Sequence, residues 1–256
     1  MSKIDLDKLS CNPPKDADKD KIKEQTLKMK AELDELQNRL YAGREHAVLI
    51  VLQGMDASGK DGTVRNVFEN INPQGIDVQA FKVPTAEESA HDFLWRVHKY
   101  TPERGMIQIF NRSYYEDILV TRVHKTIDDK TAKRHIEDIN NFEKLLVHSG
   151  THILKFFLHI SKDEQTERLE ERTSIQKKMW KFSSNDEKEA QYWDEYQKYY
   201  AECIENCDVE PWIIVPANKN WYKEYIVTKA LYDLLKSLHL KYPKVDIKQE
   251  EEQAKK

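Results

Sequence analysis

The stretch AVLIVLQGMDASGKDGT at residues 47–63 decides the fold. Its apolar run predicts a buried strand, the glycine-bounded turn after it a loop, and the residues from Thr63 onward a helix. Gly54, Gly59 and Lys60 have the spacing G-x-x-x-x-G-K, in which backbone N–H groups and the start of a helix surround phosphate oxygens. We therefore expect a phosphate-binding loop rather than a glycine-rich turn with a chance lysine.

Two carboxylates in this loop need an explanation. Asp61 stands where the pattern normally has Ser or Thr, and Asp56 lies between the two glycines. A carboxylate beside phosphate is repulsive in a low dielectric. Divalent ions that bridge carboxylate and phosphate remove the conflict, so we expect Mg²⁺ in the site, with Mn²⁺ as an alternative.

The composition limits the class of protein. The chain has 256 residues, of which 34% are charged, and its net charge is −4. Because the N-terminus has no apolar segment and the apolar runs are strand-sized, we expect a cytoplasmic protein without a membrane span. The negative net charge disfavours nucleic acid as a partner and requires that any polyanion site be a local basic patch.

Strands and helices alternate along the whole chain. Further strands are expected at 77–83, 106–110, 151–160 and 212–216, and helices at 20–41, 86–100, 135–148 and 222–239. This alternation predicts an α/β, P-loop kinase-like three-layer fold with a central parallel sheet and a helical lid. We divide the chain into an N-terminal arm and helix (1–42), a P-loop kinase-like domain (43–240) and a charged C-terminal tail (241–256).

A polar cluster follows one of the expected strands. The sequence NRSYYED at 111–117 supplies four candidates: Asn111, Arg112, Glu116 and Asp117. Polar groups at the carboxyl end of a parallel strand sit at the crevice where α/β sheets bind ligands, so this cluster should face the phosphate loop. Phosphoryl transfer needs positioning and charge neutralisation, which a loop lysine and a bidentate arginine supply.

The segment 163–200 is long, helical in pattern and dense in charge, and it falls where many P-loop kinases carry a mobile lid. Its cationic candidates are Arg168, Arg172, Lys178 and Lys181. For any single one of them, a solvated helix with glutamate partners is an equal alternative. As a set they favour a lid that delivers cations to the transferring phosphoryl group. The aromatic residues between 192 and 200 are expected in the core rather than in base stacking.

Several motifs together resemble polyphosphate kinase family 2. They are DASGKDGT at 56–63, FKVPT at 81–85, FNRSYYED at 110–117, LKFFLHISK at 154–162 and WKF at 180–182. The resemblance extends from about residue 20 to about residue 240. The form FNRSYYED resembles the class III subgroup, which phosphorylates both AMP and ADP with inorganic polyphosphate as the donor.

The resemblance implies roles for individual residues. Asp56 would be the essential loop carboxylate near metal and acceptor phosphate, Lys60 the loop lysine, and Arg112 the phosphate-binding arginine. Glu116 marks the subgroup that accepts monophosphates and would help to place a metal on the AMP side, so the implied metal ligands are Asp56 and Glu116. Asn111 stands where many relatives have Asp, which leaves direct metal binding at that position open.

The motifs and the resemblance together define the expected site. The catalytic residues are Asp56, Lys60, Asn111, Arg112, Glu116 and Asp117. The phosphate- and nucleotide-binding residues are Gly54, Ala57, Ser58, Gly59, Lys60, Asp61, Gly62, Thr63, Lys82 and Arg122. The polyphosphate-binding residues of the lid are Arg168, Arg172, Lys178 and Lys181.

The main prediction is a Mg²⁺-dependent polyphosphate:AMP/ADP phosphotransferase that uses direct in-line transfer, with GMP and GDP as further candidate acceptors. The alternatives are an ATP-dependent kinase of a nucleotide or small metabolite, and a polyphosphate-binding protein with little turnover. A phosphohistidine at His124 is less favoured, because direct transfer needs no covalent step. The resemblance also implies a homodimer or a homotetramer.

Overall fold

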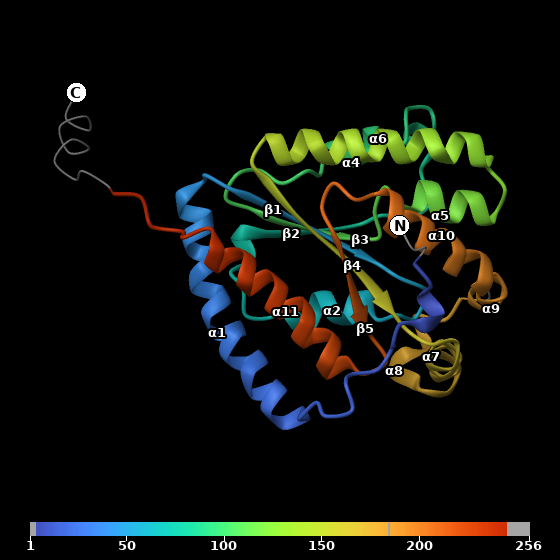
Figure 1. The fold of residues 1–256 in the computed structure, drawn as a ribbon, viewed down its shortest axis with the longest axis horizontal. Coiled ribbons are helices and arrows are strands. Elements are labelled where there is room, and N and C mark those ends of the chain that lie inside the picture. The colour runs from blue at the N-terminus through green and yellow to red at the C-terminus, as the bar shows by residue number, and fades with distance from the viewer. Residues whose placement is uncertain (1–3, 184, 245–256) are drawn as a thin grey trace.

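The computed structural model describes residues 4–183 and 185–244, and this part of the chain contains a five-stranded parallel sheet (Figure 1). The strands are β1 (Ala47–Gln53), β2 (Ile76–Ala80), β3 (Ile107–Asn111), β4 (Thr151–His159) and β5 (Trp212–Pro216). Their spatial order is β2-β3-β1-β4-β5. The predicted parallel sheet is confirmed, and β1, which leads into the phosphate loop, is its central strand.

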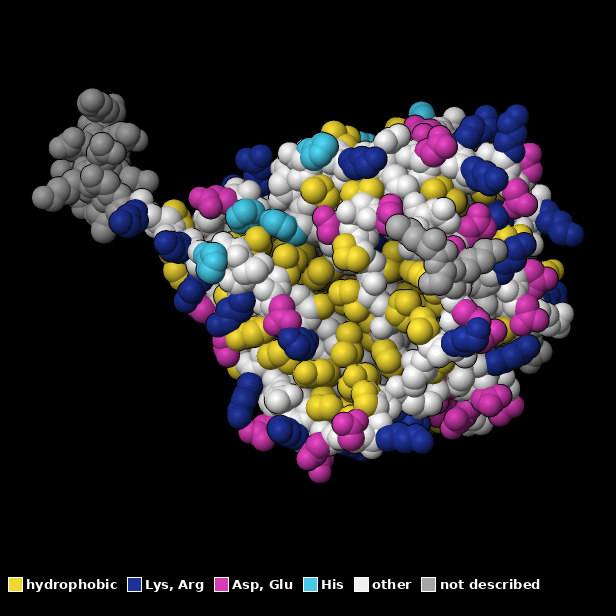
Figure 2. All heavy atoms as spheres, in the orientation of Figure 1, with side chains coloured by type: hydrophobic (Ala, Val, Ile, Leu, Met, Phe, Trp, Pro, Cys, Tyr) yellow, Lys and Arg dark blue, Asp and Glu magenta, His cyan; other side chains and the backbone are white. Residues whose placement is uncertain are grey.

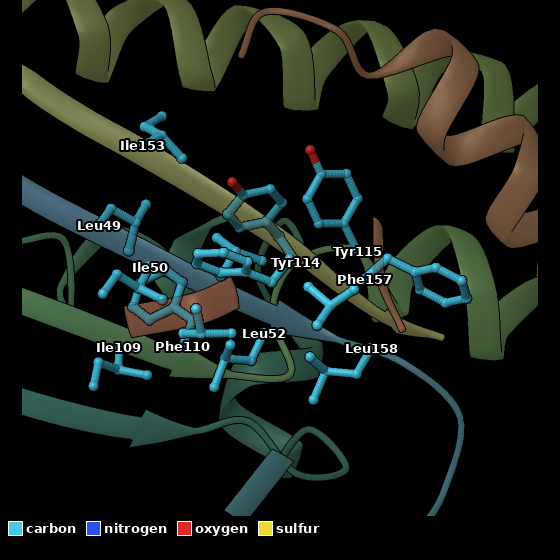
Figure 3. Close-up of a cluster of buried hydrophobic side chains, with 14 of the residues drawn as sticks. Leu49, Ile50, Leu52, Ile109, Phe110, Tyr114, Tyr115, Ile153, Phe157 and Leu158 are labelled. Carbon is cyan, nitrogen blue, oxygen red and sulfur yellow. The ribbon is translucent and has the colours of Figure 1, made fainter. Parts of the chain in front are cut away.

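β1 is buried along its whole length. In its register, Ile50 lies beside Ile109 of β3 and Leu154 of β4. A central parallel strand is covered on both faces, so both sets of alternating side chains must be apolar. This explains why the sequence of β1 is a continuous apolar run, and Figure 3 shows Leu49 and Ile50 within the resulting core cluster.

Helices cover both faces of the sheet (Figure 1). One face carries α5 (Glu116–Val123), α6 (Asp129–His148) and α10 (Trp193–Asn206), and the other carries α1 (Lys19–Gly43), α2 (Lys60–Val67) and α11 (Asn220–Ser237). In α6 the buried apolar residues recur at helical spacing: Ile136, Ile139, Phe142 and Leu146. The predicted three-layer α/β architecture is confirmed.

The N-terminal arm packs against the end of β4. Leu6 in the short helix η1 (Leu6–Lys8) is 3% exposed. The backbone oxygen of Leu6 lies 3.0 Å from Nε2 of His159. α1 then begins after Asp18, whose carboxylate accepts hydrogen bonds from two backbone N–H groups of the first turn. The described part of the arm is therefore packed against the domain.

The single helix predicted at 86–100 is wrong. Two short helices occupy this stretch, α3 (Ala86–Ser89) and α4 (Trp95–His98). The capping box of Thr85 and Glu88 is present at the start of α3. The helix stops because the Asp92 carboxylate accepts from the backbone N–H groups of Leu94 and Trp95, both at 3.0 Å, and starts a separate turn there.

The strand predicted at 77–83 is also too long. β2 ends at Ala80, opposite Asn111 at the end of β3. The N–H of Phe81 still donates to the Asn111 carbonyl at 3.1 Å, but β3 offers no strand residue beyond that point. A strand at the edge of the described sheet ends where its one neighbour ends.

Between β4 and β5 the chain forms α7 (Lys162–Ser174), α8 (Gln176–Met179), α9 (Asp186–Ala190) and α10. We call residues 162–190 the α7–α9 segment. In α10 the aromatic residues Trp193, Tyr196 and Tyr200 are buried in the main core cluster. Their predicted place in the core is confirmed, whereas Tyr192, just before the helix, is exposed.

Figure 2 shows apolar side chains gathered in the middle of the face over β5 and α11, with charged side chains around its rim. Ile213 and Ile214 of β5 and Ile226 of α11 are only partly buried there. None of the helices in the described residues combines the length and the apolarity that crossing a bilayer requires. The tail predicted at 241–256 lies, beyond residue 244, outside the described residues.

Candidate active site

The phosphate loop connects the end of β1 to the start of α2, as the motif predicts. Its backbone turns through three residues with positive φ: Gly54 (151°), Ala57 (61°) and Gly59 (94°). A side chain at Gly54 would place Cβ 2.7 Å from the carbonyl oxygen of Leu158, so this position requires glycine. At Gly62, by contrast, a Cβ would meet nothing within 4 Å.

The side chain of Lys60 folds back over the loop. Its ammonium donates to the carbonyl oxygens of Gly54 at 2.7 Å and Met55 at 3.2 Å, and the residue is 8% exposed. Burial, followed by the positive charge of Arg112, lowers the pKa of Lys60 from 10.5 to about 8. A bound phosphate would place a full negative charge next to this buried ammonium. Without phosphate, the ammonium has only carbonyl dipoles beside it and carboxylates further away.

Two hydroxyl residues of the loop are buried. Thr63 donates to the Gly59 carbonyl at 3.1 Å, which is a hydrogen bond within the first turn of α2. The Ser58 hydroxyl is buried and has no hydrogen-bond partner among residues 4–183 and 185–244. A buried polar atom without a partner is costly, and a ligand oxygen in the loop is one way to satisfy it.

Arg112, directly after β3, lies between two carboxylates. Its guanidinium donates to Oδ1 of Asp56 at 2.6 Å and lies 3.4 Å from Oε2 of Glu116. Its backbone N–H donates to the Leu52 carbonyl at 3.1 Å, which ties the end of β3 to the end of β1. The charge of Glu116, assisted by Asp56 and opposed by burial, raises the pKa of Arg112 further. The polar cluster therefore lies beside the phosphate loop, as expected.

Asp61 has both carboxylate oxygens engaged. Oδ1 accepts from the Asn111 side-chain amide at 2.8 Å, and Oδ2 accepts from the ammonium of Lys181 at 2.6 Å. Burial raises its pKa, but the hydrogen bonds from Lys181 and Asn111 outweigh it, and the pKa of Asp61 is lowered. In this structure Asn111 donates to a carboxylate, which joins the end of β3 to the loop, and the Lys181–Asp61 ion pair joins the loop to the α7–α9 segment.

Arg168 braces the loop from α7. Its guanidinium donates to Oε1 of Glu164 at 2.9 Å, to the Ala57 carbonyl at 2.9 Å and to the Ala217 carbonyl at 2.8 Å. One side chain thus joins α7, the phosphate loop and the residue that follows β5. This arginine is partly buried, unlike a cation on a solvated helix.

The other predicted cations of the α7–α9 segment form ion pairs of their own. Arg172 donates to Asp186 at 2.6 Å, and Lys178 is paired with Glu171. The Lys178–Glu171 pair is of the kind that the solvated-helix alternative requires. The pairing of Arg172 with Asp186 was not predicted from the sequence. Both cations nevertheless line the cleft described next.

A cleft of about 960 Å³ lies between the phosphate loop and the α7–α9 segment. Its positively charged lining includes Lys60, Lys82, Arg112, Arg172, Lys178 and Lys181. A second, smaller cavity of about 30 Å³ lies against Asp56, Arg112 and Glu116. The two cavities share Asp56 and Arg112, so the structure places this pair between a broad cationic cleft and a narrow acidic pocket.

Asp117 and Arg122 line neither cavity. Burial raises the pKa of Asp117 to about 6, with the Arg96 charge opposing it. Arg122 is held by Asp129 at 2.8 Å and Glu202 at 3.0 Å. The sequence places both residues close to the site, but α5 turns them away from it because only one face of a helix can point into the cleft.

Two further residues of the site escaped sequence reasoning. Lys223 of α11 is 1% exposed, and its ammonium donates to Oδ1 of Asn220 at 2.9 Å and reaches the Gly59 carbonyl at 3.4 Å. Burial, followed by the charge of Arg168, lowers its pKa to about 8. Gln165 donates to the Asp56 backbone carbonyl at 3.0 Å.

A signal for the missed lysine does exist in the sequence. Lys223 precedes Val227, Leu231 and Leu235 at intervals of four, so it occupies the buried stripe of the helix. A lysine on a buried stripe is unusual unless a partner compensates it.

The acidic residues suit magnesium in the way that kinases use it. Among residues 4–183 and 185–244, no group of three or more His, Cys, Asp or Glu side chains is arranged to hold a metal by itself. Mg²⁺ bound with phosphates commonly takes only one or two carboxylates from the protein. Asp56 and Glu116, which both face Arg112, provide such a pair.

Comparison with known proteins places this chain in a family. The family model of polyphosphate kinase 2 (PPK2) matches residues 16–243. The chain belongs to the PPK2 family. A PPK2 crystal structure from Arthrobacter aurescens is 40% identical and has a TM-score of 0.92, over 96% of this chain and 90% of that chain.

Two curated relatives of this PPK2 chain are similar in sequence over most of their length. An AMP/ADP-polyphosphate phosphotransferase from Meiothermus ruber is 48% identical over 82% of this chain and 80% of the relative. An ADP-polyphosphate phosphotransferase from Rhodopseudomonas palustris is 44% identical over 82% of this chain and 78% of the relative. The resemblance drawn from the motifs is therefore confirmed at the level of the family.

Proposed function

We propose that this PPK2 protein transfers the terminal phosphoryl group of inorganic polyphosphate to AMP and ADP. The observation that carries the proposal is the arrangement of the Asp56–Arg112 pair between the cationic cleft and the acidic pocket. A polymer of phosphates has no base to recognise, so a cleft that reads charge and spacing suffices for the donor. The Meiothermus ruber relative, an AMP/ADP-polyphosphate phosphotransferase, supports the same donor and the same acceptors.

The residues of the site divide the work of an in-line transfer. Lys60 and Arg112 neutralise the charge on the transferring group, and the backbone N–H groups of the loop hold its oxygens. Asp56 and Glu116 would hold Mg²⁺, which supplies charge neutralisation between carboxylate and phosphate. When they do so, Arg112 exchanges its carboxylate partners for phosphate oxygens, to which its planar fork donates equally well.

The α7–α9 segment acts as the lid in this proposal. Lys181 reaches from it to Asp61 in the loop, and Arg168 links its first helix to the loop backbone. Opening of the Lys181–Asp61 ion pair would admit the donor, after which Lys181 and the other cleft cations contact its phosphates. Lys82 belongs to this donor-facing set because it lines the same cleft.

The activity is tested by incubating the purified protein with AMP, Mg²⁺ and polyphosphate and separating the nucleotides by chromatography. Formation of ADP and ATP is the expected result. If ATP serves as the donor and polyphosphate does not, the protein is instead an ATP-dependent kinase. Replacement of Mg²⁺ by Mn²⁺, and of AMP by GMP or GDP, then defines the metal and the base selectivity.

Asp56→Asn separates an enzyme from a polyphosphate-binding protein. The variant should lose at least about a hundredfold in kcat, because a charge that organises the transition state is removed. Asp233→Asn is a matched control, since it removes a carboxylate from an exposed ion pair with Lys229. Equal activity of both variants would show that Asp56 has no catalytic role and would favour the binding protein.

A phosphohistidine route receives no support from the geometry. His124 lies 3.0 Å from a carboxylate oxygen of Glu189 and lines neither of the two cavities. A cytoplasmic location, the absence of nucleic-acid and membrane partners, and a homodimer or homotetramer stay predictions. Light scattering on the purified protein measures the last of these directly.

A further inference from the structure

A charged network lies in the core behind the active site. Lys155 of β4 and Glu143 of α6 form an ion pair at 2.7 Å, and both side chains are 0% exposed. A buried ion pair is weak evidence for stability, because the cost of removing two charges from water can exceed their mutual attraction. The position of this pair therefore needs another explanation than stability.

The hydrogen bonds of the pair lead to two consecutive tyrosines. Oε1 of Glu143 accepts from the hydroxyls of Tyr114 and Tyr115, at 2.8 and 2.5 Å. The ammonium of Lys155 also donates to the Tyr115 hydroxyl at 3.1 Å and to the Cys207 carbonyl at 2.9 Å. Lys155 thus uses all three N–H donors of its ammonium. Figure 3 shows both tyrosine rings in the core cluster with their hydroxyls on the same side.

Both hydroxyls remain donors at any ordinary pH. Tyr114 and Tyr115 are 0% exposed, and burial, followed by the charge of Glu143, raises the pKa of each well above its usual value. A protonated hydroxyl must find an acceptor when it is buried. Glu143 is that acceptor for both, so a tyrosine that leaves its place gives up the hydrogen bond of its own buried hydroxyl.

These tyrosines stand between two residues of the active site. Arg112 lies two positions before Tyr114, and Glu116 follows Tyr115 directly. Arg112 has φ of 63°, a left-handed conformation that is strained for a residue other than glycine. Such a conformation persists only where the surroundings over-determine it. The buried hydrogen bonds of Tyr114 and Tyr115 to Glu143 meet this condition. A shift of the chain by one residue would break both hydrogen bonds.

We propose that Glu143 and Lys155 are positioning residues for phosphoryl transfer, which hold Arg112 in place between the cleft and the pocket through Tyr114 and Tyr115. The inference rests on the proposed function. Neither Glu143 nor Lys155 lines either cavity, so they act without touching a substrate. The ion pair fixes the segment that follows β3. It thereby holds the strained backbone of Arg112, the residue of this segment that contacts the phosphate in the proposed function.

A double-mutant cycle between Tyr115→Phe and Arg112→Lys tests the proposal. If Tyr115 acts by positioning Arg112, the losses in kcat of the two variants overlap. Once lysine replaces the planar guanidinium, correct positioning by Tyr115 no longer contributes to kcat. Each single variant should lower kcat about tenfold, and the double variant no more than about threefold below the worse single one. Independent effects would multiply to about a hundredfold, and that result overturns the proposal.

Tyr232→Phe is the matched control. It removes one tyrosine–glutamate hydrogen bond, to Glu32 at 2.9 Å, that joins α11 to α1 on the surface. The variant should keep the wild-type kcat, and its effect should multiply with that of Arg112→Lys. A loss of stability alone would not depend on the residue at position 112, whereas the overlap with Arg112 is expected only for Tyr115.

A neutral version of the ion pair tests the source of the effect. Glu143→Gln combined with Lys155→Met removes both charges and leaves no unpaired ion in the core. The fold should persist in thermal melts, and kcat should fall about tenfold while the KM for AMP changes less than about threefold. A folded variant with the wild-type kcat overturns the proposal.

The proposed function can fail separately from this inference. Wild-type turnover is measured first with polyphosphate and with ATP. If ATP alone is the donor, the proposed function is wrong and the same cycle is run with ATP. If neither donor is used, the cycle is measured as affinity for tripolyphosphate by calorimetry, where additive effects again overturn the positioning role.

Discussion

Replacing Lys60 by Met should stabilise the folded protein while it abolishes phosphoryl transfer. The ammonium is buried, and its pKa is lowered from 10.5 to about 8. At neutral pH the charged lysine therefore costs the folded state about 3 kcal/mol relative to the unfolded chain, since each pKa unit corresponds to about 1.4 kcal/mol. Methionine fills a similar volume without the charge and so avoids this cost.

Part of the gain is offset by lost hydrogen bonds. The ammonium donates to the carbonyls of Gly54 and Met55 at 2.7 and 3.2 Å, and methionine cannot. Two such losses cost roughly 1 kcal/mol each. The net stabilisation at neutral pH is thus about 1 kcal/mol, or about 2–4 °C in Tm. Transfer should fall by at least about a hundredfold, because the phosphate loses its buried cation.

The pH dependence of stability makes this reasoning testable. Because the folded protein holds this proton less tightly than the unfolded chain, unfolding takes up a proton between about pH 8 and about pH 10.5, and wild-type stability rises with pH across that window. Lys60→Met lacks this rise. The difference between variant and wild type should therefore shift by about 2–3 kcal/mol, in favour of the wild type, between about pH 7 and about pH 10.

Urea unfolding at the two pH values measures this shift. Lys21→Met, at an exposed position of α1, is the control and should show no comparable change. A Lys60→Met protein that is less stable than the wild type at neutral pH would refute the reasoning. So would a stability difference that does not change with pH, because burial of the charge would then not be the cause.

Three further predictions concern the cleft and its surroundings. Lys181→Met should raise the KM for polyphosphate several-fold, and an unchanged KM in steady-state kinetics would contradict the lid assignment. Because its ion pair with Asp61 is exposed, the free energy of unfolding should change by less than about 1 kcal/mol. Asp117→Asn should keep its activity. In the wild type the folded state binds the Asp117 proton more tightly than the unfolded chain, so stability falls as pH rises from 3.8 to about 6; the variant should lack this fall in urea unfolding across that range. Raising NaCl from about 50 to about 200 mM should increase the KM for polyphosphate far more than that for AMP, because only the polymer releases many counterions; equal changes would show that the cleft does not bind a polyanion.

The central parts of the fold and the site could be predicted from local sequence. The continuous apolar run of β1 indicates a parallel strand covered on both faces, and the glycine spacing after it indicates the loop. The same holds for Arg112, because a polar residue directly after a parallel strand lies at the carboxyl edge of the sheet. These features depend on residues that are close together in the chain.

Other parts of the site depend on contacts between distant segments. Arg168 was expected to face the donor; it does line the cleft, but it also spans from α7 to Ala57 and Ala217, which the sequence did not predict. Arg122 was expected to bind phosphate, yet Asp129 and Glu202 hold it on the side of α5 away from the cleft. A list of cations does not show which acidic groups or carbonyls the folded chain will place within reach of each one.

The sequence by itself determined the chemistry of the central loop: a phosphate cradle with Lys60 and two carboxylates, on a strand that had to be central because it is apolar on both faces. Only the tertiary structure decided which charges face the substrates. Lys223 approaches the loop from 164 residues away, and the Glu143–Lys155 pair meets the two tyrosines that follow Arg112 only because α6 and β4 pack behind them. Coulomb forces and hydrogen bonds depend on distance in space, and a chain specifies those distances only once its layers are packed.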